Sequence, residues 1–334
     1  MLACPRNQFF LLDAVEGARR NIPDGAVDLV VTDPPYGIEG HSLHKHYNRN
    51  EAFVVDGYVE VPAKRYEAFT KEWVRELERV LRPGGSAFVV SGYTNLRHLL
   101  NALAETSLQE VNHLIWKYNF GVATRRKFVS SHYHILYCYK PGGERTFNSF
   151  ARYGSQDRKE SGRSLQYADL EDVWIINREY KPGQVKNKNQ LPSALLAKIL
   201  QYASNPDDLV LDFFLGSFST AVVAKALGRD SVGFELNPHA FASGSKAWEN
   251  TERNSMLVHL PSGQDDRPEA AGTPFSTGEV EAISRFVDRL VADGSTKKEA
   301  IRRAMEKHRR GYWSIEKVLK KSRGTMSSPT PLFE

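Results

Sequence analysis

The chain has 334 residues, 41% of them apolar and 25% charged, and a formal net charge of +5 at pH 7. This length and apolar content allow one large globular domain, or a domain with a small appendage, and they exclude a chain too polar to bury a core. No run approaches the roughly 18 apolar residues of a membrane helix, and the N-terminal MLACPRNQFF lacks a signal-peptide pattern, so we expect a cytoplasmic protein with no membrane partner. The two cysteines, Cys4 and Cys138, form neither a disulfide framework nor a metal site by themselves.

Seven short runs rich in β-branched and aromatic residues recur along the chain, mostly with helical segments between them. This alternation is typical of a parallel sheet covered by helices on both faces. The runs are residues 8–12, 27–32, 86–91, 111–118, 132–139, 209–214 and 231–236. No helix separates 111–118 from 132–139, which predicts an antiparallel hairpin. We therefore expect an α/β fold with a Rossmann-like, seven-stranded mixed sheet that contains one antiparallel hairpin strand.

Apolar residues at helical spacing predict the helices. The stretch YEAFTKEWVRELERVLRPGG, residues 66–85, has such a face, and Pro83, Gly84 and Gly85 are expected to end its helix. The face consists of Phe69, Trp73, Leu77, Val80 and Leu81. Further helices are expected over 191–204 and from Thr220 to Gly228. Residues 141–162 show no periodicity and predict a mobile loop, and we take 141–186 as an insertion and a candidate target-recognition region.

The basic character of the chain belongs to its C-terminal part. Residues 277–323 hold 13 Lys and Arg against 7 Asp and Glu, so the remainder is close to neutral. Composition predicts a main domain over 1–260, a linker over 261–276, three short helices in a basic helix-turn-helix-like module over 277–323, and a tail over 324–334. A basic module favours nucleic acid as a partner, whereas the alternative is a solvated helical hairpin that packs on the main domain.

The stretch VVTDPPYG, residues 30–37, ends an apolar strand with a rigid corner. In an open α/β sheet, ligands bind at the carboxyl ends of strands. Each proline restricts the residue before it to extended geometry and offers no N–H group, so the corner is rich in hydrogen-bond acceptors. The Asp33 carboxylate and the Pro34 carbonyl can accept both hydrogens of one exocyclic amino group, while Tyr36 offers a flat face to a base.

This arrangement suits methylation of the amino nitrogen of adenine or cytosine, whose lone pair is delocalised into the ring. Two acceptors that hold the amino hydrogens turn the lone pair toward an electrophile, and such positioning can lower a barrier by at most about 7–11 kcal/mol. We therefore predict Asp33, Pro34, Pro35 and Tyr36 as catalytic residues that hold the amino group in line with an activated methyl group. The alternative is a diproline turn capped by an aspartate.

A second motif has the pattern of a nucleotide-type cofactor site. The stretch LVLDFFLGSFSTAVVAKALG, residues 209–228, combines a strand, the acidic Asp212, a glycine turn and a helix, and Glu235 ends the next strand. Glycine lets the backbone approach a ligand, and an acid about 20 residues further on can bind ribose hydroxyls.

With the DPPY corner placed before this glycine-rich motif, residues 6–250 resemble the β class of DNA amino-methyltransferases. The resemblance implies an S-adenosyl-L-methionine-dependent methyltransferase domain with a seven-stranded sheet, double-stranded DNA as its substrate, a flipped target base, and a cognate restriction endonuclease as a candidate partner. It implies that Asp13 contacts the adenine end of the cofactor, that Glu235 holds its ribose and that residues 188–192 lie against its methionine end. The implied cofactor residues are Asp13, Ala14, Lys188, Asn189, Gln190, Leu191, Pro192, Asp212, Phe213, Phe214, Gly216, Ser217, Phe218, Ser219, Glu235, Leu236 and Asn237.

Two phenylalanines depart from the family pattern. The usual D-P-F-x-G-S-G-T corresponds to residues 212–219, where Phe213 replaces the proline and Phe218 replaces the second glycine. Two outcomes are open for Phe218: its ring crowds the cofactor, or it stacks against the adenosine or the sulfonium.

Adenine N6 is the expected target, because the DPPY form goes with adenine in this resemblance, and cytosine N4 is the alternative. Transfer to cytosine C5 is disfavoured because it needs a Pro-Cys nucleophile, and the chain has only Cys4-Pro5, in the opposite order. A catalytically weak DNA-binding or regulatory protein on the same fold is a further alternative, and so is a methyltransferase that acts on protein or on a small molecule.

Basic residues of the hairpin loop and of the C-terminal module are the candidate DNA contacts. They are Arg125, Arg126, Lys127, Lys297, Lys298, Arg302, Arg303, Arg309, Arg310 and Lys317, and the insertion adds Arg145, Arg152, Arg158, Lys159 and Arg163. His41, His44 and His46 have no cysteine near them, so we expect no metal and place them on a loop along the DNA or in solvent. The recognition sequence and the oligomeric state do not follow from the sequence.

Overall fold

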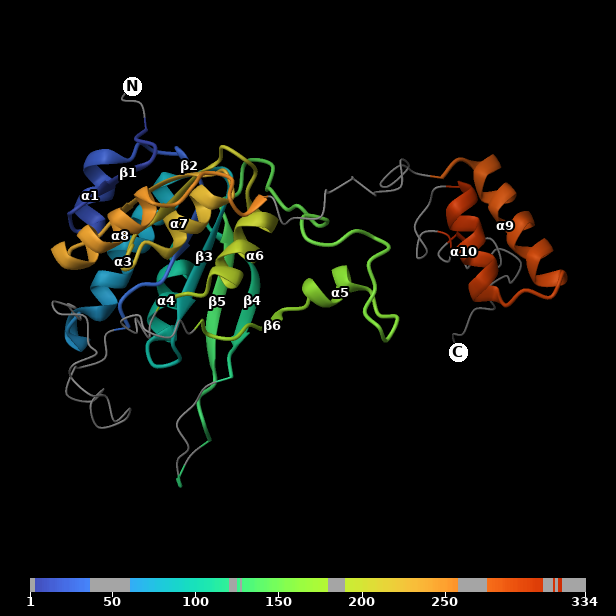
Figure 1. Cartoon of the computed structure of the whole chain (residues 1–334), viewed down its shortest axis with the longest axis horizontal. Coiled ribbons are helices and arrows are strands. Elements are labelled where there is room, and N and C mark those ends of the chain that lie inside the picture. Colours follow the sequence, from blue (N-terminus) through green and yellow to red (C-terminus); the bar gives the residue numbers. More distant parts are fainter. Residues whose placement is uncertain are drawn as a thin grey trace, which may run out of the picture. The chain divides into compact units, whose positions relative to one another are not determined.

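Strands and helices alternate along most of the chain and form a sheet with helices on both faces (Figure 1). The computed structural model describes residues 4–36, 61–119, 125–126, 128–179, 190–257, 275–308, 315 and 318–319. The chain divides into two compact units, Met1–Gly263 and Gln264–Glu334. Among the described helices, none combines the length and the apolarity that a membrane span requires.

The larger unit contains a mixed sheet with the strand order β1-β8-β7-β2-β3-β5-β4-β6. The strands are β1 (Gln8–Phe10), β2 (Val27–Thr32), β3 (Leu81–Ser91), β4 (Gln109–Lys117), β5 (His132–Tyr139), β6 (Val173–Ile175), β7 (Leu209–Asp212) and β8 (Asp230–Phe234). Among them β5 runs antiparallel to both of its neighbours, β3 and β4, while the remaining pairs are parallel. The mixed α/β sheet with an antiparallel hairpin is confirmed. The expected number of seven strands is wrong, because β6 has three residues and is too short for its periodicity to show.

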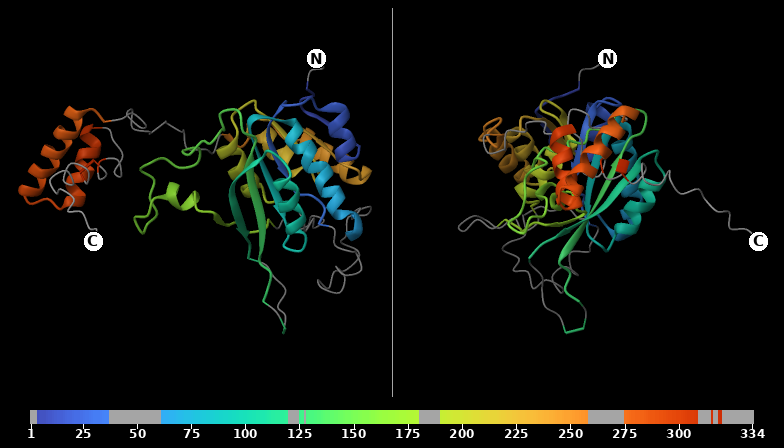
Figure 2. Two further views of the ribbon diagram at one scale, coloured as in Figure 1. Left: turned by 180° about the vertical axis from the view of Figure 1, so that it is seen from behind. Right: turned by 90° about the vertical axis from the view of Figure 1, so that its right-hand side faces the viewer.

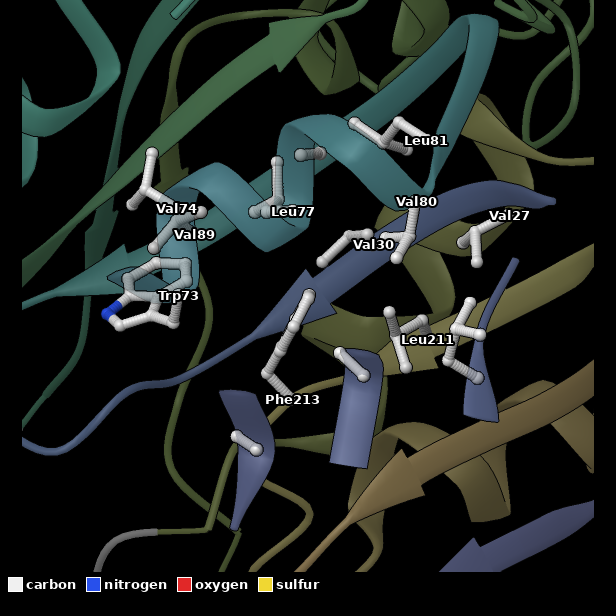
Figure 3. Packing of buried hydrophobic residues seen from close by; sticks show 14 of the residues in the cluster. Val27, Val30, Trp73, Val74, Leu77, Val80, Leu81, Val89, Leu211 and Phe213 are labelled. Carbon is white, nitrogen blue, oxygen red and sulfur yellow. The ribbon is translucent and has the colours of Figure 1, made fainter. Parts of the chain in front are cut away.

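Helices cover both faces of this sheet (Figures 1 and 2). One face is covered by α1 (Ala14–Asn21), α3 (Ala63–Val80) and α4 (Leu96–Ala104), and the other by α6 (Ser193–Ala203) and α7 (Ser219–Ala226). In β2, Val30 faces the first layer while Leu29 and Val31 face the second, because successive side chains of a strand alternate. Figure 3 shows Trp73 and Leu77 of α3 in the first layer with Val30.

Helix α3 ends earlier than its sequence predicts. It ends at Val80, and Leu81 already belongs to β3, where it pairs with Val27. Leu81 is fully buried, as a residue on the apolar face of a helix would also be. The apolar pattern therefore could not distinguish the last turn of a helix from the first residue of a central strand. Pro83 and Gly84 therefore lie within the strand that follows the helix rather than at the helix end.

The described part of the insertion packs against α6 and does not form the loose loop that we expected. The Asn148 N–H donates to the Tyr202 carbonyl at 2.8 Å. Arg152 donates to Asp169 at 2.8 Å and to Gln201 at 2.7 Å. The insertion contributes the short α5 (Leu165–Asp169) and β6 at the edge of the sheet. It therefore extends the sheet.

The smaller unit contains α9 (Thr277–Ala292) and α10 (Lys297–His308). Ser276 caps α9, and Thr296 and Glu299 form a reciprocal capping box at the start of α10. Its apolar cluster comprises Ile283, Val287, Ala300, Ile301, Ala304, Ile315 and Leu319, with Phe275, Phe286 and Leu290 packed against it. Of the third expected helix, residues 315, 318 and 319 are described and are helical, while Trp313 and its neighbours lie outside the described residues.

Candidate active site

The candidate site lies where the connections of the sheet diverge. From β2 the chain crosses through α3 to β3 on one side, and from β7 it crosses through α7 to β8 on the other, so β2 and β7 are neighbours at a switch point. Ligands of open α/β sheets bind outside the carboxyl ends of such strands. Asp33 follows β2 directly, and Asp212 is the last residue of β7. The two sequence motifs are therefore brought to the same place.

The corner formed by residues 33–36 is stabilised by one hydrogen bond within it and by two from side chains elsewhere in the chain. Tyr36 donates from its hydroxyl to Asp33 Oδ1 at 2.5 Å. Tyr66 of α3 donates from its hydroxyl to the Pro35 carbonyl at 3.0 Å, and the Asn95 side-chain amide, which precedes α4, donates to the Tyr36 carbonyl. Helices from one layer therefore fix the path of the corner, as its prolines alone could not.

An aromatic stack supports the Tyr36 ring. Tyr133 of β5 stacks on it with centroids 5.7 Å apart and an interplanar angle of 27°, and Trp116 of β4 stacks on Tyr133 at 5.5 Å and 24°. The Arg178 guanidinium lies 4.5 Å from the ring centroid of Tyr118, which in turn contacts Tyr133 at 5.6 Å. Sequence reasoning missed these residues, although the alternating aromatic residues at the ends of the predicted hairpin strands are a signal that could have pointed to them.

Two carboxyl groups in this site have raised pKa values. Burial raises the pKa of Asp33 from 3.8 to about 7; the hydrogen bond from Tyr36 opposes the rise and the charge of Asp212 adds to it. Burial also raises the pKa of Asp212 to about 6, against hydrogen bonds that include one from the Phe214 N–H. Thr32 donates to Asp212 Oδ1 at 2.9 Å. Asp33 is therefore able to exchange a proton near neutral pH, which suits a group that contacts a reacting amine.

The glycine turn after β7 is closed by Glu235. The Gly216 N–H donates to Glu235 Oε2 at 2.7 Å, and the Asn237 N–H donates to Oε1 at 2.8 Å. Each carboxylate oxygen has a second lone pair that can accept a ligand hydroxyl. Ser217 and Ser219 share a hydrogen bond of 2.8 Å between their hydroxyls.

Exposed leucines flank this carboxylate. Leu236 follows Glu235 and is 54% exposed, and Leu11 after β1 is 46% exposed. The Glu235 N–H donates to the Phe10 carbonyl at 3.1 Å, so the two leucines leave neighbouring strand ends. A carboxylate with exposed apolar residues next to it, on its own and on the neighbouring strand end, fits a nucleoside, which has ribose hydroxyls and a flat ring.

Phe218 faces the protein interior and not the predicted cofactor site. Its ring is fully buried, with Phe9 at 4.9 Å and Phe241 at 5.6 Å between centroids. The backbone of Phe218 has a φ of 64°, a value that residues other than glycine rarely adopt. Gly244 of α8 (Pro238–Glu249) leaves the space for it, because a Cβ there would lie 2.1 Å from Phe218 Cδ2. This packing supports neither crowding of the cofactor nor stacking on it, and a contact of Phe218 with a cofactor stays a prediction.

Other predicted cofactor residues use their side chains within the fold. Phe213 is fully buried in the core, and Phe214 packs edge-on against Trp73. Asp13 caps α1 by accepting the N–H groups of Val15 and Glu16. The remaining positions are as follows: Ala14, Leu191, Pro192 and Asn237 are buried, Gln190 is exposed, and Lys188 and Asn189 lie outside the described residues. Direct contacts of these residues with a cofactor stay predictions.

The candidate DNA contacts are only partly described. Arg125, Arg126, Lys297 and Arg303 are exposed. Lys127, Arg309, Arg310 and Lys317, the side chains of Lys298 and Arg302, and His41, His44 and His46 lie outside the described residues. In the insertion, Arg145 lies over the ring of Tyr139 and Arg163 pairs with Glu171 at 3.2 Å, so both already have partners within the protein. The described part of the chain contains no group of three or more side chains that could hold a metal ion.

Comparisons with known proteins show the family to which the chain belongs. A family described as DNA methylase, with N6 and N4 members, matches residues 27–246. Type II methyltransferase M.HinfI of Haemophilus influenzae is 29% identical to this chain over an alignment that covers 65% of this chain and 61% of that protein's length. Type II methyltransferase M.HpaI of Haemophilus parainfluenzae is 29% identical over 66% of this chain and 67% of its own length.

Solved structures share the fold. They include TTHA0409, a putative DNA modification methylase from Thermus thermophilus in complex with S-adenosyl-L-methionine, with a TM-score of 0.53 at 21% identity over 73% of this chain and 94% of that one. The cytosine-N4-specific PvuII DNA methyltransferase has a TM-score of 0.54 at 17% identity over 77% of this chain and 91% of that one. Since the family match covers well over half of the sequence, the chain belongs to the N6/N4 DNA methylase family.

Proposed function

We propose that this protein transfers a methyl group from S-adenosylmethionine to the N6 amino group of an adenine flipped out of duplex DNA. The observation that carries this proposal is the meeting of the Asp33–Tyr36 corner with Asp212 at the switch point of the sheet. Family membership and the type II methyltransferases among the similar proteins support DNA as the substrate. Adenine is favoured because aspartate stands at the first position of the corner.

The residues around Glu235 fit the proposed cofactor. The Glu235 carboxylate has lone pairs left for ribose hydroxyls, and Leu11 and Leu236 provide apolar surface for the adenine ring. When bound, S-adenosylmethionine supplies an activated methyl group. Glu235 and the Gly216 turn orient it, and the buried Asp212 lies between this end of the site and the Asp33 corner.

The corner positions the base. Tyr36, supported by Tyr133, stacks on the flipped adenine, and the Asp33 carboxylate and the Pro34 carbonyl accept the two hydrogens of its amino group. The nitrogen lone pair then points at the methyl group, a carbon–nitrogen bond forms, and the sulfur leaves with its bonding electrons. Asp33 takes the proton that the methylated nitrogen loses and passes it to water, which its raised pKa permits.

Exposed basic residues are proposed to bind the DNA backbone. Arg125 and Arg126 project from the segment between β4 and β5, and Lys297 and Arg303 lie on α10. Such contacts place the protein on the duplex without reading its sequence. A cognate restriction endonuclease as a partner stays a prediction.

Methylation-sensitive single-molecule sequencing tests the proposal directly. DNA from a methylation-free host that expresses the protein would be compared with DNA from a host that expresses Asp33→Ala. N6-methyladenine at one recognition sequence, present only with the unchanged protein, is the expected result. Absence of any methylated base with a folded protein would refute the methyl transfer and favour a DNA-binding protein without catalysis.

Cytosine N4 is the second candidate, since the cytosine-N4-specific PvuII enzyme has the same fold. The fold by itself does not distinguish the two bases. The same sequencing experiment does: an N4-methylcytosine signal would keep the roles of the corner and change the base.

A further inference from the structure

Arg178 emerges from a rigid part of the insertion. It lies three residues after β6, which pairs in parallel with β4. Beyond the strand, the Ile176 N–H donates to the Lys117 carbonyl at 3.0 Å, and the Trp116 indole donates to the Ile176 carbonyl at 2.8 Å. The backbone that leads to Arg178 is therefore fixed to β4, and the side chain enters the site from a defined direction.

The Arg178 guanidinium packs among the rings that support the corner. It lies 4.5 Å from the ring centroid of Tyr118, 5.4 Å from that of Tyr133 and 5.8 Å from that of Trp116. A planar guanidinium can stack on aromatic faces and still donate hydrogen bonds in its plane, which an ammonium group cannot do. Arg178 thus holds the ring that lies under Tyr36.

The same guanidinium acts electrostatically on Asp33. Within the described part of the chain, the Tyr36 hydroxyl donates to Asp33, the ring of Tyr133 stacks on that of Tyr36, and Arg178 lies over Tyr133, so the guanidinium and the Asp33 carboxyl belong to one cluster. Asp212 at the end of β7 is the neighbouring acid that acts on the same carboxyl. Among these, Arg178 carries the positive charge and stabilises the ionised carboxylate, whereas the charge of Asp212 destabilises it. An attraction of this kind keeps an acceptor available for the amino hydrogens of a base.

We propose that Arg178 is a positioning residue for the methyl transfer. It holds Tyr133 beneath the base-stacking Tyr36, and its charge favours the ionised form of Asp33, which accepts hydrogen bonds. This inference rests on the proposed function for its meaning, but its electrostatic claim concerns the free protein and can be measured without substrate.

Two substitutions separate the charge from the planar stack. Arg178→Gln removes the charge, so the Asp33 carboxyl should titrate about 1 pH unit higher than in the unchanged protein. Arg178→Lys keeps the charge and loses the planar face. The titration midpoint of Asp33 should therefore stay unchanged, while the positioning of the base becomes less accurate. Arg145→Gln is the matched control, because Arg145 also lies over aromatic rings, those of Tyr137 and Tyr139. Tyr139 pairs with the buried Ser86, which stands beside Leu29, whereas Val89 stands beside Thr32 at the end of β2 that leads to Asp33.

The first measurement is a carbon-13 NMR titration of the full chain labelled at aspartate carboxyl groups, with the Asp33 signal assigned by its loss in Asp33→Asn. We expect a midpoint near pH 7 for the unchanged protein, Arg178→Lys and Arg145→Gln, and a higher midpoint for Arg178→Gln. An unshifted midpoint in Arg178→Gln would overturn the electrostatic claim. If Arg178→Gln does not fold, the same comparison is made with Arg178→Met.

The second measurement is kcat/KM for methyl transfer at pH 7 and pH 9. For a midpoint shift of about 1 pH unit, the factor by which Arg178→Gln lowers kcat/KM should be about fivefold larger at pH 7 than at pH 9, because the ionised fraction of Asp33 recovers at high pH. Arg178→Lys should lose activity by the same factor at both pH values, chiefly in kcat. Arg178→Lys with unchanged kcat would refute the claim that the planar face holds the stack.

Failure of the inference and failure of the proposed function give different results. If the unchanged protein transfers no methyl group to DNA, the proposed function fails, yet the NMR titration still decides the electrostatic claim. If the unchanged protein is active but Arg178→Gln leaves the Asp33 midpoint unshifted or Arg178→Lys leaves kcat unchanged, the inference fails alone.

Discussion

Ionisation of Asp33 should cost the folded protein stability. The pKa of this carboxyl is 3.8 as a free side chain and about 7 in the fold. Because the folded state keeps the proton up to about pH 7 while the unfolded chain releases it near pH 4, the contribution to stability is complete below the lower pKa and is lost as the pH rises through the higher one. At about 1.36 kcal/mol per pKa unit, the loss approaches about 4 kcal/mol above pH 7.

Asp33→Asn removes this titration and keeps an oxygen that can accept the Tyr36 hydroxyl. The stability of the variant relative to the unchanged protein should therefore increase by about 2–3 kcal/mol between pH 5 and pH 8. Urea unfolding at both pH values measures this change, and comparing two pH values cancels the pH-independent effects of the substitution. Asp172→Asn is the control, since that residue is exposed. A stability difference that is the same at pH 5 and pH 8 would refute the burial of the Asp33 charge.

Three further predictions concern the packing of the cofactor turn, the corner and the C-terminal unit. Phe218→Ala should cost about 3–5 kcal/mol in urea unfolding, and Phe218→Gly should cost about 1 kcal/mol less because its φ of 64° suits glycine. Gly244→Ala should destabilise the unchanged protein but much less the Phe218→Ala background, and additive effects would contradict the close approach of Phe218 to Gly244. Tyr36→Phe should keep base stacking and move the acid limb of kcat/KM to higher pH, because Asp33 loses a hydrogen bond. Tyr36→Ala should lose more activity than Tyr36→Phe at every pH, and equal losses in the two variants would argue against stacking. Deleting 264–334 should weaken DNA binding. The slope of the logarithm of the binding constant against the logarithm of the salt concentration should become less steep by about 0.9 for each phosphate that the protein no longer neutralises. Cofactor affinity, measured by calorimetry, should stay unchanged.

Local sequence signals were sufficient for the parts of the site that lie on single strand ends. The Asp33 corner and the Glu235 carboxylate both follow apolar strands that the alternation of residues predicts, and β2 and β5 have the expected bounds. Proline and glycine act on the backbone next to them, and strand periodicity is short-ranged. For this reason the α/β class, the antiparallel hairpin and the two motif positions could be predicted without any tertiary contact.

Contacts between residues far apart in the chain decided the rest. The hydroxyls and rings around Tyr36 come from β4, β5 and α3, and Arg178 reaches them only because the three-residue β6 pairs with β4. The direction of the Phe218 ring depends on the space above Gly244, which no pattern near residue 218 encodes. The raised pKa of Asp33 likewise depends on burial by the whole fold. By itself, the sequence determined which residues stand at the strand ends, because backbone preferences are local; which side chains surround them, and with what charge, was decided only by packing between distant segments.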